Sequence, residues 1–453
     1  MTNISWKQGE LIEVNITDTT DTGDGVGRSH QRVVFVPDTV PGDRALVRLV
    51  HVKSTHAHAK LQQILQPSSY RIRPSCIVAD KCGGCQWQHI DYEYQLEAKR
   101  NQVIQALERI GGFVEPPVDR VLRAASALGY RNKATYPMGV SATGNVQTGY
   151  YQKGSHQLIN LNQCPVQDSR LNSLLAKIKQ DIQKRNWPIY NEQHHTGIIR
   201  HLGLRIGRRT GEILLTLVVK DWNLPGIKDQ AQEWLKHYPT LVGVCLNHNP
   251  KRTNTIFGSE TRCISGIAYL REEFAGLEFR VRPDTFFQVS TETAENLLQV
   301  IQSELHLQGT EILLDTYCGI GTLTLPLAKQ VRQAIGLEIQ PEAVEQAIDN
   351  AKYNQITNVT FMTGAVEKLL PQLEIKPDIV LLDPPRKGCD RQVVETLLEF
   401  QPERIVYVSC KVATLARDLK LFCENGVYTL TRVQPADFFP QTAHVEAAAF
   451  LVR

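Results

Sequence analysis

The last third of the chain alternates short apolar runs with helix-like segments, and this rhythm restricts the fold more than any other feature. Seven apolar runs are expected to be strands, at residues 312–315, 334–339, 359–362, 379–383, 405–409, 427–433 and 447–452. Helical stretches fall between most of them. Strands that alternate with helices build a doubly wound, mostly parallel sheet, which binds ligands at the carboxyl ends of its strands. The sequence therefore predicts an α/β domain over residues 283–453.

Two further units precede this domain. Residues 1–68 contain short apolar runs separated by glycine- and proline-containing turns, which is typical of a small β-barrel. Residues 69–282 mix strand and helix patterns and are expected to form an α+β domain, with a helix predicted over residues 91–110. A chain of 453 residues is too long for one compact core, which agrees with a division into three units.

Positive charge is concentrated in two stretches. The formal net charge of +3 is too small to indicate a nucleic-acid partner by itself. Residues 44–79, however, contain six Lys or Arg and three His, and residues 193–211 contain four Arg and three His, without any acidic residue in either stretch. A charge block is often only a solvated face. Two of them favour an RNA-facing surface, because phosphate neutralisation depends on local charge.

The sequence shows no sign of export or of membrane insertion. The first residues lack the apolar segment of a signal peptide, and no apolar run reaches the roughly 18–20 residues of a membrane span. We therefore expect a cytoplasmic protein that is monomeric and has no membrane partner. In a reducing compartment, ten cysteines serve more often as ligands, nucleophiles or buried thiols than as disulfides.

A glycine-rich turn follows the first strand of the C-terminal domain. Asp315 ends that strand, and glycines in Cys318-Gly319-Ile320-Gly321 allow the backbone to approach a ligand. Glu338 ends the second strand, where an acid can hydrogen-bond a ribose diol. A strand–turn–helix without a ligand is the plain alternative. The turn lacks the full G-x-G-x-x-G of nicotinamide-binding proteins, so S-adenosylmethionine fits better.

Two residues near the end of the sequence are candidates for catalysis. Cys410 follows an apolar strand and precedes Lys411 and a helix, a position that favours a lowered thiol pKa. Glu446 begins the last apolar run, where partial desolvation should raise its pKa toward that of a general base. A buried structural thiol and an exposed acid are the ordinary alternatives. Cys389 is a competing nucleophile in a loop, and four further cysteines are assigned to packing: Cys245, Cys263, Cys318 and Cys423.

A group of cysteines lies far from these residues in the sequence. Cys76, Cys82 and Cys85 are closely spaced, and Cys164 is a candidate fourth member. Four thiols complete a tetrahedral ligand set. The spacing is neither the paired Cys-x2-Cys of zinc sites nor the Cys-x3-Cys-x2-Cys of radical enzymes. We expect a four-iron cubane cluster first, structural zinc second, and coincidental reduced thiols third.

Several motifs together resemble the RNA (uracil-5-)-methyltransferases, particularly the iron–sulfur-containing 23S ribosomal RNA (uracil-5-)-methyltransferases with an N-terminal TRAM domain. The resemblance covers nearly the whole chain. It is carried by Gly23–Arg28 in the barrel, Phe286-Phe287-Gln288, Asp383-Pro384-Pro385-Arg386, Ser409-Cys410 with Thr414–Asp418, and Phe439–Glu446. Ala365 stands where the family has an Asp or Asn near the adenine, so no adenine contact is assigned.

The resemblance implies a Rossmann-like methyltransferase domain, an OB-like RNA-binding barrel and a set of functional residues. Cys410 is implied as the nucleophile and Glu446 as the base, while Gln288, Tyr317, Glu338 and Asp383 would contact S-adenosylmethionine. Cys76, Cys82, Cys85 and Cys164 would hold a [4Fe-4S] cluster.

The implied reaction transfers a methyl group from S-adenosylmethionine to C5 of a uridine in 23S rRNA through a covalent Cys410–C6 adduct. The same chemistry on the T-loop uridine of tRNA is the first alternative. A non-enzymatic iron–sulfur RNA-binding protein is the second alternative.

Overall fold

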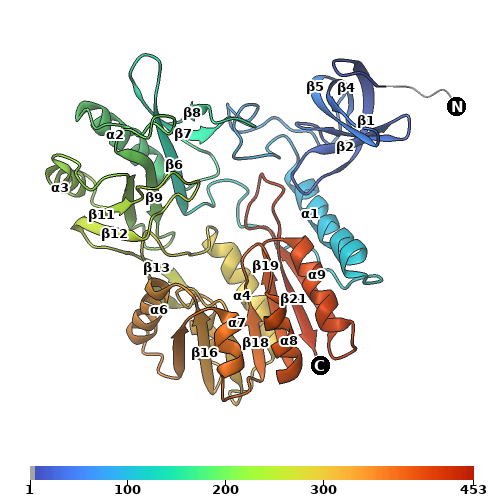
Figure 1. Ribbon diagram of the computed structural model, residues 1–453, viewed down its shortest axis with the longest axis vertical. Helices are drawn as coiled ribbons and strands as arrows, with labels where there is room; N and C mark the ends of the chain where they lie inside the picture. The colour runs from blue at the N-terminus through green and yellow to red at the C-terminus, as the bar shows by residue number, and fades with distance from the viewer. Residues whose placement is uncertain (1–5) are drawn as a thin grey trace.

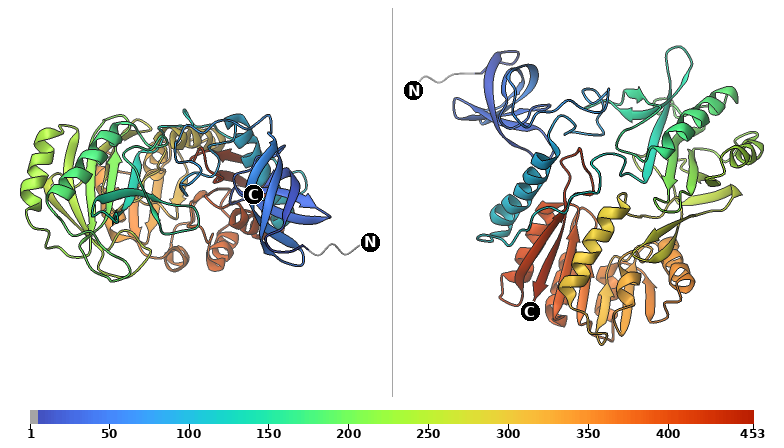
Figure 2. Two further views of the ribbon diagram at one scale, coloured as in Figure 1. Left: turned by 90° about the horizontal axis from the view of Figure 1, so that it is seen from above. Right: turned by 180° about the vertical axis from the view of Figure 1, so that it is seen from behind.

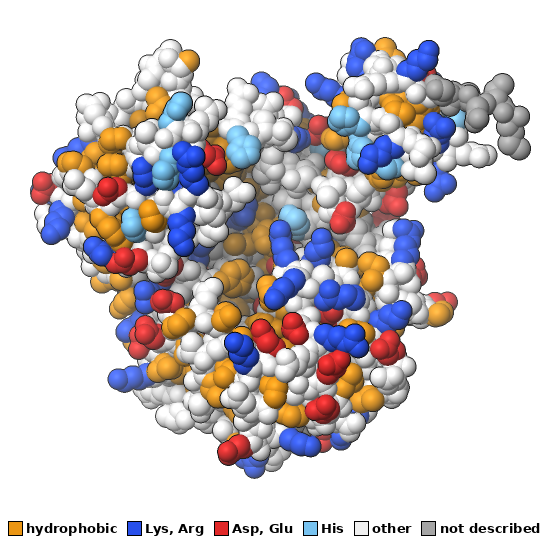
Figure 3. Space-filling model, viewed as in Figure 1, with side chains coloured by type: hydrophobic (Ala, Val, Ile, Leu, Met, Phe, Trp, Pro, Cys, Tyr) orange, Lys and Arg blue, Asp and Glu red, His pale blue; other side chains and the backbone are white. Residues whose placement is uncertain are grey.

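The computed structural model describes residues 6–453, which form two arms above a C-terminal domain (Figure 1). The N-terminal barrel makes one arm and the central domain the other. The space-filling view shows a hollow between the arms, with the C-terminal domain at its floor (Figure 3). Among the helices of residues 6–453, none is long and apolar enough to cross a membrane.

The N-terminal arm is a closed five-stranded barrel with the order β1-β2-β3-β5-β4. Its strands are β1 (Leu11–Thr19), β2 (Gly25–Ser29), β3 (Arg32–Val36), β4 (Arg44–Val52) and β5 (His56–Gln66). The predicted barrel is confirmed, but β2 was not predicted as a strand. Its glycines explain the difference, because a Cβ on Gly27 would lie 2.3 Å from Cγ1 of Val14. Glycine is needed here for close approach of β1 and β2.

Helix α1 (Tyr92–Ala106) connects the arms to the C-terminal domain. Asp91 caps it by accepting hydrogen bonds from the backbone amides of Glu93 and Tyr94. A π-helical turn (Leu107–Gly111) continues it, and Gly112 ends it in the left-handed conformation. The predicted helix is thus confirmed. Seen from behind, α1 lies beside the last strands of the C-terminal sheet (Figure 2).

The central arm is the α+β unit predicted from the sequence. Its seven-stranded sheet has the order β12-β11-β10-β9-β6-β7-β8 and carries two long helices, α2 (Arg170–Lys184) and α3 (Ile227–His237). The strands are β6 (Lys133–Val140), β7 (Val146–Tyr151), β8 (Leu158–Asn160), β9 (Ile199–Ile206), β10 (Ile213–Val219), β11 (Leu241–His248) and β12 (Glu260–Gly266). A hairpin of β13 (Leu270–Phe274) and β14 (Leu277–Val281) leads into the next domain.

The C-terminal domain contains all seven predicted strands in one sheet with the order β17-β16-β15-β18-β19-β21-β20. They are β15 (Ile312–Asp315), β16 (Gln333–Glu338), β17 (Val359–Thr363), β18 (Ile379–Leu382), β19 (Arg404–Ser409), β20 (Thr429–Ala436) and β21 (Glu446–Val452). The first five in spatial order are parallel, and β21 runs antiparallel to both its neighbours. The doubly wound, mostly parallel sheet is therefore confirmed.

Helices cover both faces of this sheet. They are α4 (Thr291–Leu305), α5 (Thr324–Ala328), α6 (Pro341–Tyr353), α7 (Val366–Leu369), α8 (Arg391–Phe400) and α9 (Val412–Cys423). Adjacent residues of one strand enter different cores, since Leu313 packs in the cluster that contains α4 and Leu314 in the cluster that contains α9. Burial on both faces explains why these strands read as continuous apolar runs.

The arginines of the second basic stretch, residues 193–211, make internal contacts, which leaves less free charge for RNA than the sequence suggested. Arg200 is buried and donates to the carbonyl oxygens of Asn249 and Lys251, each at 2.7 Å. Arg208 pairs with Asp168 and with Glu292 of α4. These arginines fix the central arm internally and to the C-terminal domain. Charge counted along the sequence does not reveal the distant partners that neutralise it.

Candidate active site

A small cavity lies where β15 and β18 end, as predicted for a doubly wound sheet. Gln288, Tyr317 and Asp383, three of the four predicted cofactor residues, line it together with Asp315 and Gly319. The fourth, Glu338, lies behind the glycine turn rather than among the lining residues. Its carboxylate accepts hydrogen bonds from the backbone amides of Gly319 at 3.1 Å and Gln340 at 2.8 Å. The structure thus gathers all four around one turn.

Two carboxylates give this cavity an unusual electrostatic character. Burial raises the pKa of Asp315 to about 6, and burial together with the charge of Asp315 raises the pKa of Asp383 to about 7. Thr324 Oγ1 donates to Asp315 at 2.6 Å and holds its carboxylate in place. Two acids that disfavour their own ionisation attract a cationic ligand, because a positive charge stabilises both ionised forms. A sulfonium ion with an amino group has that character.

A second cavity, of about 280 Å³, contains Cys410. It is lined from the C-terminal domain by Arg386, Lys411 and His444, among others. The pKa of Cys410 is raised by burial and by the charges of Glu446 and Asp383, while Arg386 acts in the opposite direction. The sequence suggested a lowered pKa instead. The two carboxylates that reverse the direction come from β21 and from the end of β18, so their proximity is not visible in the sequence.

Glu446 is the first residue of β21 and is almost fully buried. Burial, and then the charge of Asp383, raise the pKa of Glu446 to about 8, which is the direction expected from the sequence. Asp383 therefore lines the cofactor cavity and also acts on both Cys410 and Glu446. The structure brings the predicted nucleophile, the predicted base and one predicted cofactor contact to the same place.

The segment Thr414–Asp418 in α9 holds the loop that carries Arg386. Thr414 Oγ1 donates to the carbonyl oxygen of Arg386 at 3.4 Å, and Arg417 donates to that of Lys387 at 3.0 Å. The carboxylate of Asp418 accepts from the backbone amide of Cys389 at 2.9 Å. Cys389 is itself buried, and burial raises the pKa of its thiol to about 12, so it is poorly suited to act as a nucleophile. Sequence reasoning missed the importance of Arg386.

Helix α1 and the segment before it hold the loop 437–445, which leads to Glu446 and rises from the sheet toward the barrel (Figure 2). Lys99 Nζ donates to Asp437 Oδ1 at 2.6 Å and to the carbonyl oxygen of Phe439 at 3.1 Å, and both charged side chains are fully buried. Gln95 and Trp87 bond to the backbone of Gln441, each at 2.9 Å. No signal in the sequence links these residues across more than 300 positions.

Residues of the two arms also reach the cavity at Cys410. Asp21 and Thr22 come from the turn between β1 and β2, Gln86 from the cysteine-containing segment, and Gln102 from α1. The charge of Asp21 acts on His444 across the cavity mouth and opposes the lowering of its pKa by burial. The site is thus built by parts of the chain from both arms and from the C-terminal domain. None of these four residues was selected from the sequence.

The four predicted ligand cysteines line one enclosed cavity together with Arg131. They are Cys76, Cys82, Cys85 and Cys164. Burial raises the pKa of Cys82, of Cys164 and, to about 11, of Cys85. Arg131 Nε is buried and has no hydrogen-bond partner among residues 6–453. Three desolvated thiols together with Cys76, beside a buried guanidinium with an unsatisfied donor, fit an anionic thiolate-bound group.

Over the described part of the chain, the structure does not support a site for a single metal ion, and it does not support a packing role for Cys263. Within residues 6–453, no three His, Cys, Asp or Glu side chains are grouped tightly enough to hold a single metal ion. A cubane places each thiolate on a different iron, so its ligands lie farther apart than those of one zinc ion. Cys263, assigned to packing, is exposed on β12, opposite the buried Cys245 of β11.

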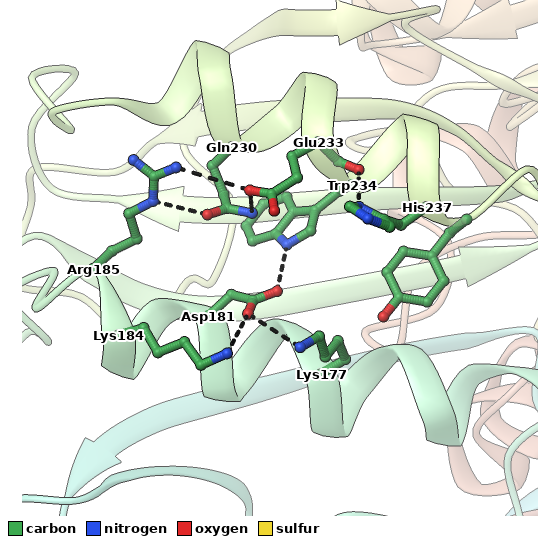
Figure 4. A pocket seen from close by; sticks show the side chains of 9 residues that line it. Lys177, Asp181, Lys184, Arg185, Gln230, Glu233, Trp234 and His237 are labelled. Atoms are coloured by element: carbon green, nitrogen blue, oxygen red, sulfur yellow. Dashed lines mark hydrogen bonds and ion pairs between the residues drawn. The ribbon is translucent and has the colours of Figure 1, made fainter.

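A larger groove, of about 550 Å³, lies between α2 and α3 (Figure 4). Its charged side chains are paired with one another. Asp181 accepts from Trp234 Nε1 at 3.0 Å and pairs with Lys177 at 3.6 Å, while Arg185 donates to Gln230 at 2.8 Å. None of the predicted functional residues lies there. Size alone therefore does not mark the active site of this protein.

Comparison with known families gives two matches that follow the architecture. The family model described as tRNA (uracil-5-)-methyltransferase matches residues 268–453, and the TRAM domain model matches residues 5–61. A Nostoc protein named as an uncharacterized RNA methyltransferase is 76% identical over 452 residues, which cover 100% of this chain and 98% of that protein. A Synechocystis protein of the same description is 56% identical and covers 98% and 96% of the two chains.

One solved structure is similar over the full length. The Pyrococcus abyssi tRNA (uracil-54, C5)-methyltransferase, solved with S-adenosyl-L-homocysteine, is 27% identical to this chain. The alignment covers 97% of this chain and 100% of that one, with a TM-score of 0.78. The similarity therefore extends across both arms as well as the C-terminal domain.

Proposed function

From the premise that this chain belongs to the RNA (uracil-5-)-methyltransferase family, and is an S-adenosylmethionine-dependent enzyme of that family, we propose that it methylates C5 of a uridine in 23S rRNA. One observation carries the proposal. Asp383 lines the cofactor cavity and lies close enough to Cys410 and Glu446 to alter the pKa of both. A methyl donor bound in the first cavity would thus lie next to a uracil base held at Cys410.

The proposed mechanism begins with the chemistry of the acceptor. C5 of uracil is a weak nucleophile, and a thiolate that adds to C6 turns it into an enolate-like carbon. Cys410 Sγ forms the bond to C6, and C5 then takes the methyl group from the sulfonium. Glu446 removes the remaining proton from C5, and elimination breaks the S–C6 bond and frees the thiolate. The uridine has to leave the stack, because C5 and C6 are unreachable within it.

In this proposal, Arg386 and the carboxylates of Asp383 and Glu446 have opposite effects on the ionisation of Cys410. Arg386 favours the ionised thiol, and its side chain hydrogen-bonds Cys410. Gln288, Tyr317, Glu338 and Asp383 would hold S-adenosylmethionine, whose positive charge the acids would stabilise. Ionised carboxylates raise the pKa of Cys410, so a cationic cofactor in the neighbouring cavity would offset that effect. Binding of the methyl donor would then favour the thiolate when it is needed.

The direct test offers tritiated S-adenosylmethionine together with unmodified 23S rRNA or tRNA, followed by nucleoside analysis. We expect labelled 5-methyluridine in 23S rRNA. Cys410→Ala should abolish transfer while leaving cofactor affinity unchanged, because the thiol does not line the cofactor cavity. Label in the RNA from the Cys410→Ala protein would disprove covalent catalysis at this residue.

Transfer RNA is the second candidate substrate. The observation in its favour is the full-length structural similarity to the Pyrococcus abyssi enzyme, whose name specifies uridine 54 of tRNA. The same assay separates the two, since label found only in tRNA would assign the T-loop uridine. In either case residues 1–68 would bind RNA, residues 69–282 would hold the cluster and further RNA contacts, and residues 283–453 would transfer the methyl group. We place the enzyme in the cytoplasm as a monomer.

We also propose that Cys76, Cys82, Cys85 and Cys164 hold a [4Fe-4S] cluster. Their shared cavity and the unsatisfied Arg131 support it, since a cluster bound by four thiolates is anionic. Anaerobic purification should give a protein with visible absorption that bleaches on reduction and with iron and sulfide in equal amounts. Cys85→Ser should lose this spectrum. One zinc ion per chain without sulfide would instead assign a structural zinc site.

A further inference from the structure

Three flat side chains lie together on the outer surface of the barrel. Phe35 on β3 and His58 on β5 occupy paired positions of two parallel strands. Their rings stack, with centroids 5.1 Å apart and planes inclined by 30°. The ring of His56 meets both edge-on, at 5.7 Å from Phe35 and 5.6 Å from His58. We call these three residues the ring cluster.

The ring cluster is not part of the barrel core. The interior of β3 is filled by Val34 and Val36, which are completely buried, so Phe35 points outward by strand alternation. His58 is exposed, and Phe35 and His56 are half-buried. An aromatic and two imidazole rings at the surface therefore leave flat area open to solvent, which a ring of a ligand would cover.

The charges around the ring cluster favour binding of a polyanion. His56 and His58 belong to the basic stretch 44–79, which contains no acidic residue. Lys60 lies two residues beyond His58 on the same face of β5, and Lys53 lies in the turn before β5, and both are exposed. Two carboxylates of the barrel lie close by. The charge of His58 acts on Asp24, in the turn between β1 and β2, and Asp38, which also acts on Asp24, pairs with Lys153.

That turn connects the ring cluster to the active site. Asp24 lies beside His58, and three residues earlier in the same turn Asp21 lines the cavity that contains Cys410. Trp87 Nε1 donates to the carbonyl oxygen of Gly23 at 3.1 Å and fixes the turn between the two places. Figure 3 shows histidine side chains on the side of the barrel that borders the hollow. An RNA strand entering the cavity from the hollow would thus pass the ring cluster.

We propose that the ring cluster is a stacking site for an unpaired base next to the uridine that enters the cavity at Cys410. The inference rests on the proposed function only in taking RNA as the substrate. Extruding one nucleotide leaves its neighbours without a stacking partner. Flat side chains beside a basic surface replace that partner, and they do so for any base, because every base has a π-face.

The test separates stacking from charge. The probe is a fluorescently labelled, unstructured oligoribonucleotide of about 12 nucleotides, which matches the span of one such barrel. We expect His58→Ala and Phe35→Leu each to weaken binding about tenfold. His58→Tyr keeps a flat ring and should bind like the unaltered protein. His58→Lys supplies charge without a ring and should bind as weakly as His58→Ala.

The matched control is His30→Asn, which removes another exposed histidine of the same barrel, in the turn between β2 and β3, and tolerates its positive φ. It should bind the oligoribonucleotide normally. Equal binding by His58→Lys and the unaltered protein would show a phosphate contact and overturn the stacking site. Unchanged binding by both His58→Ala and Phe35→Leu would also overturn it.

Methyl transfer measured on the same preparations keeps the two proposals apart. If the unaltered protein methylates RNA and the ring variants bind normally, the stacking site fails and the proposed function stands. If the ring variants lose binding but the unaltered protein labels neither 23S rRNA nor tRNA, the stacking site stands and the proposed substrates fail. Cofactor affinity should be the same in every variant, because the barrel contributes no residue to that cavity.

Discussion

At the scale of single residues, Glu446 combines a buried position with a need for charge. In the proposed reaction it must be ionised to take a proton from C5, yet burial raises its pKa to about 8. Its neighbour Asp383 opposes ionisation further. The base of the proposed reaction is therefore protonated in most molecules at neutral pH until ligands arrive. The buried position of Glu446 therefore makes its ionised form costly in the folded protein.

Replacing Glu446 by Gln should separate methylation from release. Addition of Cys410 and methyl transfer do not need the carboxylate, but removal of the C5 proton does. The expected product is a methylated protein–RNA adduct that persists on a denaturing gel and contains label from S-adenosylmethionine. The Cys410→Ala protein, which cannot form an adduct, is the control. Turnover at the normal rate by Glu446→Gln would exclude Glu446 as the base.

The same substitution should change stability in a pH-dependent way. A carboxyl whose pKa is higher in the folded than in the unfolded protein binds its proton more tightly when folded, so stability falls as pH rises between the two pKa values. For Glu446 that window runs from 4.5 to about 8. Glu446→Gln cannot ionise and avoids this loss.

Because a tenfold change in proton affinity corresponds to about 1.4 kcal/mol, the advantage of Glu446→Gln should grow to roughly 5 kcal/mol and stay constant above about pH 8. Urea unfolding between about pH 5 and pH 9 measures it. A constant difference across the whole range would show that the pKa of Glu446 is not raised.

The residue scale also shows what the sequence could provide. Cys410 and Glu446 were recognised because each stands at the end of an apolar run within a specific motif. The direction of the Glu446 pKa followed from its apolar neighbours in the sequence. The direction of the Cys410 pKa did not, because Asp383 and Glu446 approach the thiol only through the order of the strands. Local pattern predicts desolvation, but it does not predict charges from other strands.

At the scale of elements, α1 supports the loop that carries the base. Lys99 and Asp437 form a fully buried ion pair between the helix and this loop. Removing one partner of such a pair leaves an uncompensated buried charge and costs roughly 3–5 kcal/mol. Lys99 touches neither cavity, so it is a positioning residue for Glu446.

Lys99→Met should lower the free energy of unfolding by about 3 kcal/mol and lower kcat for methyl transfer, with little change in KM for the cofactor. Lys99→Met combined with Asp437→Asn removes the stranded charge and keeps an acceptor for the backbone amide of Phe439. The double variant should recover at least half of the stability. Glu97→Met, on the exposed side of the same helix, is the control. Equal stability of the single and double variants would rule out an uncompensated charge.

The elements themselves were predictable wherever pattern and burial agree. The seven strands of the C-terminal sheet and the helix α1 follow from apolar runs and from caps. β2 was not predicted, because glycine is uncommon in strands, and here the close approach of β1 requires it. The contacts between α1 and the loop 437–445 could not be read from the sequence, since no local pattern encodes a partner so far away.

At the scale of the whole molecule, the barrel is fixed to the rest of the protein by specific contacts. Asp38 pairs with Lys153 of the central arm at 2.5 Å, and Asp43 pairs with Arg71 at 2.6 Å. Gly23 lies against Gln86, and a Cβ at Gly23 would lie 2.8 Å from Cβ of Gln86. The turn between β1 and β2, which reaches the cavity at Cys410, thus packs so closely that position 23 has no room for a side chain.

Gly23→Ala should therefore displace the turn and reduce RNA methylation at least tenfold, with cofactor affinity unchanged. Gly9→Ala is a matched control, because Gly9 has a similar positive φ of 88° against 95°, but open space around it. Each variant bears the backbone strain of about 1–2 kcal/mol for alanine in this region. Methyl transfer and calorimetric cofactor binding are measured on both. Equal methylation by the two variants would show that the close packing of Gly23 against Gln86 is unimportant for the reaction.

The arrangement of the arms was the part that sequence reasoning foresaw least. Three units and their classes were predicted, but the basic stretch 193–211 was assigned to an RNA-facing surface. Its arginines instead bond to carbonyl groups and to Asp168 within the central arm, and to Glu292 of the C-terminal domain. Composition indicates that charge is present, and only the packed molecule shows which charges remain free.

The order of strands at the end of the sheet has a consequence for the assembly of the enzyme during folding. β20 pairs only with β21, so it joins the sheet after β21 or together with it as a hairpin. The cofactor cavity is lined by residues before 384, and helix α4, which follows Gln288, packs against β20 and β21. Glu446 arrives with the hairpin and meets Cys410 only on docking. In the proposed reaction, the pairing of β21 with β19 is therefore the contact that brings the base to the nucleophile.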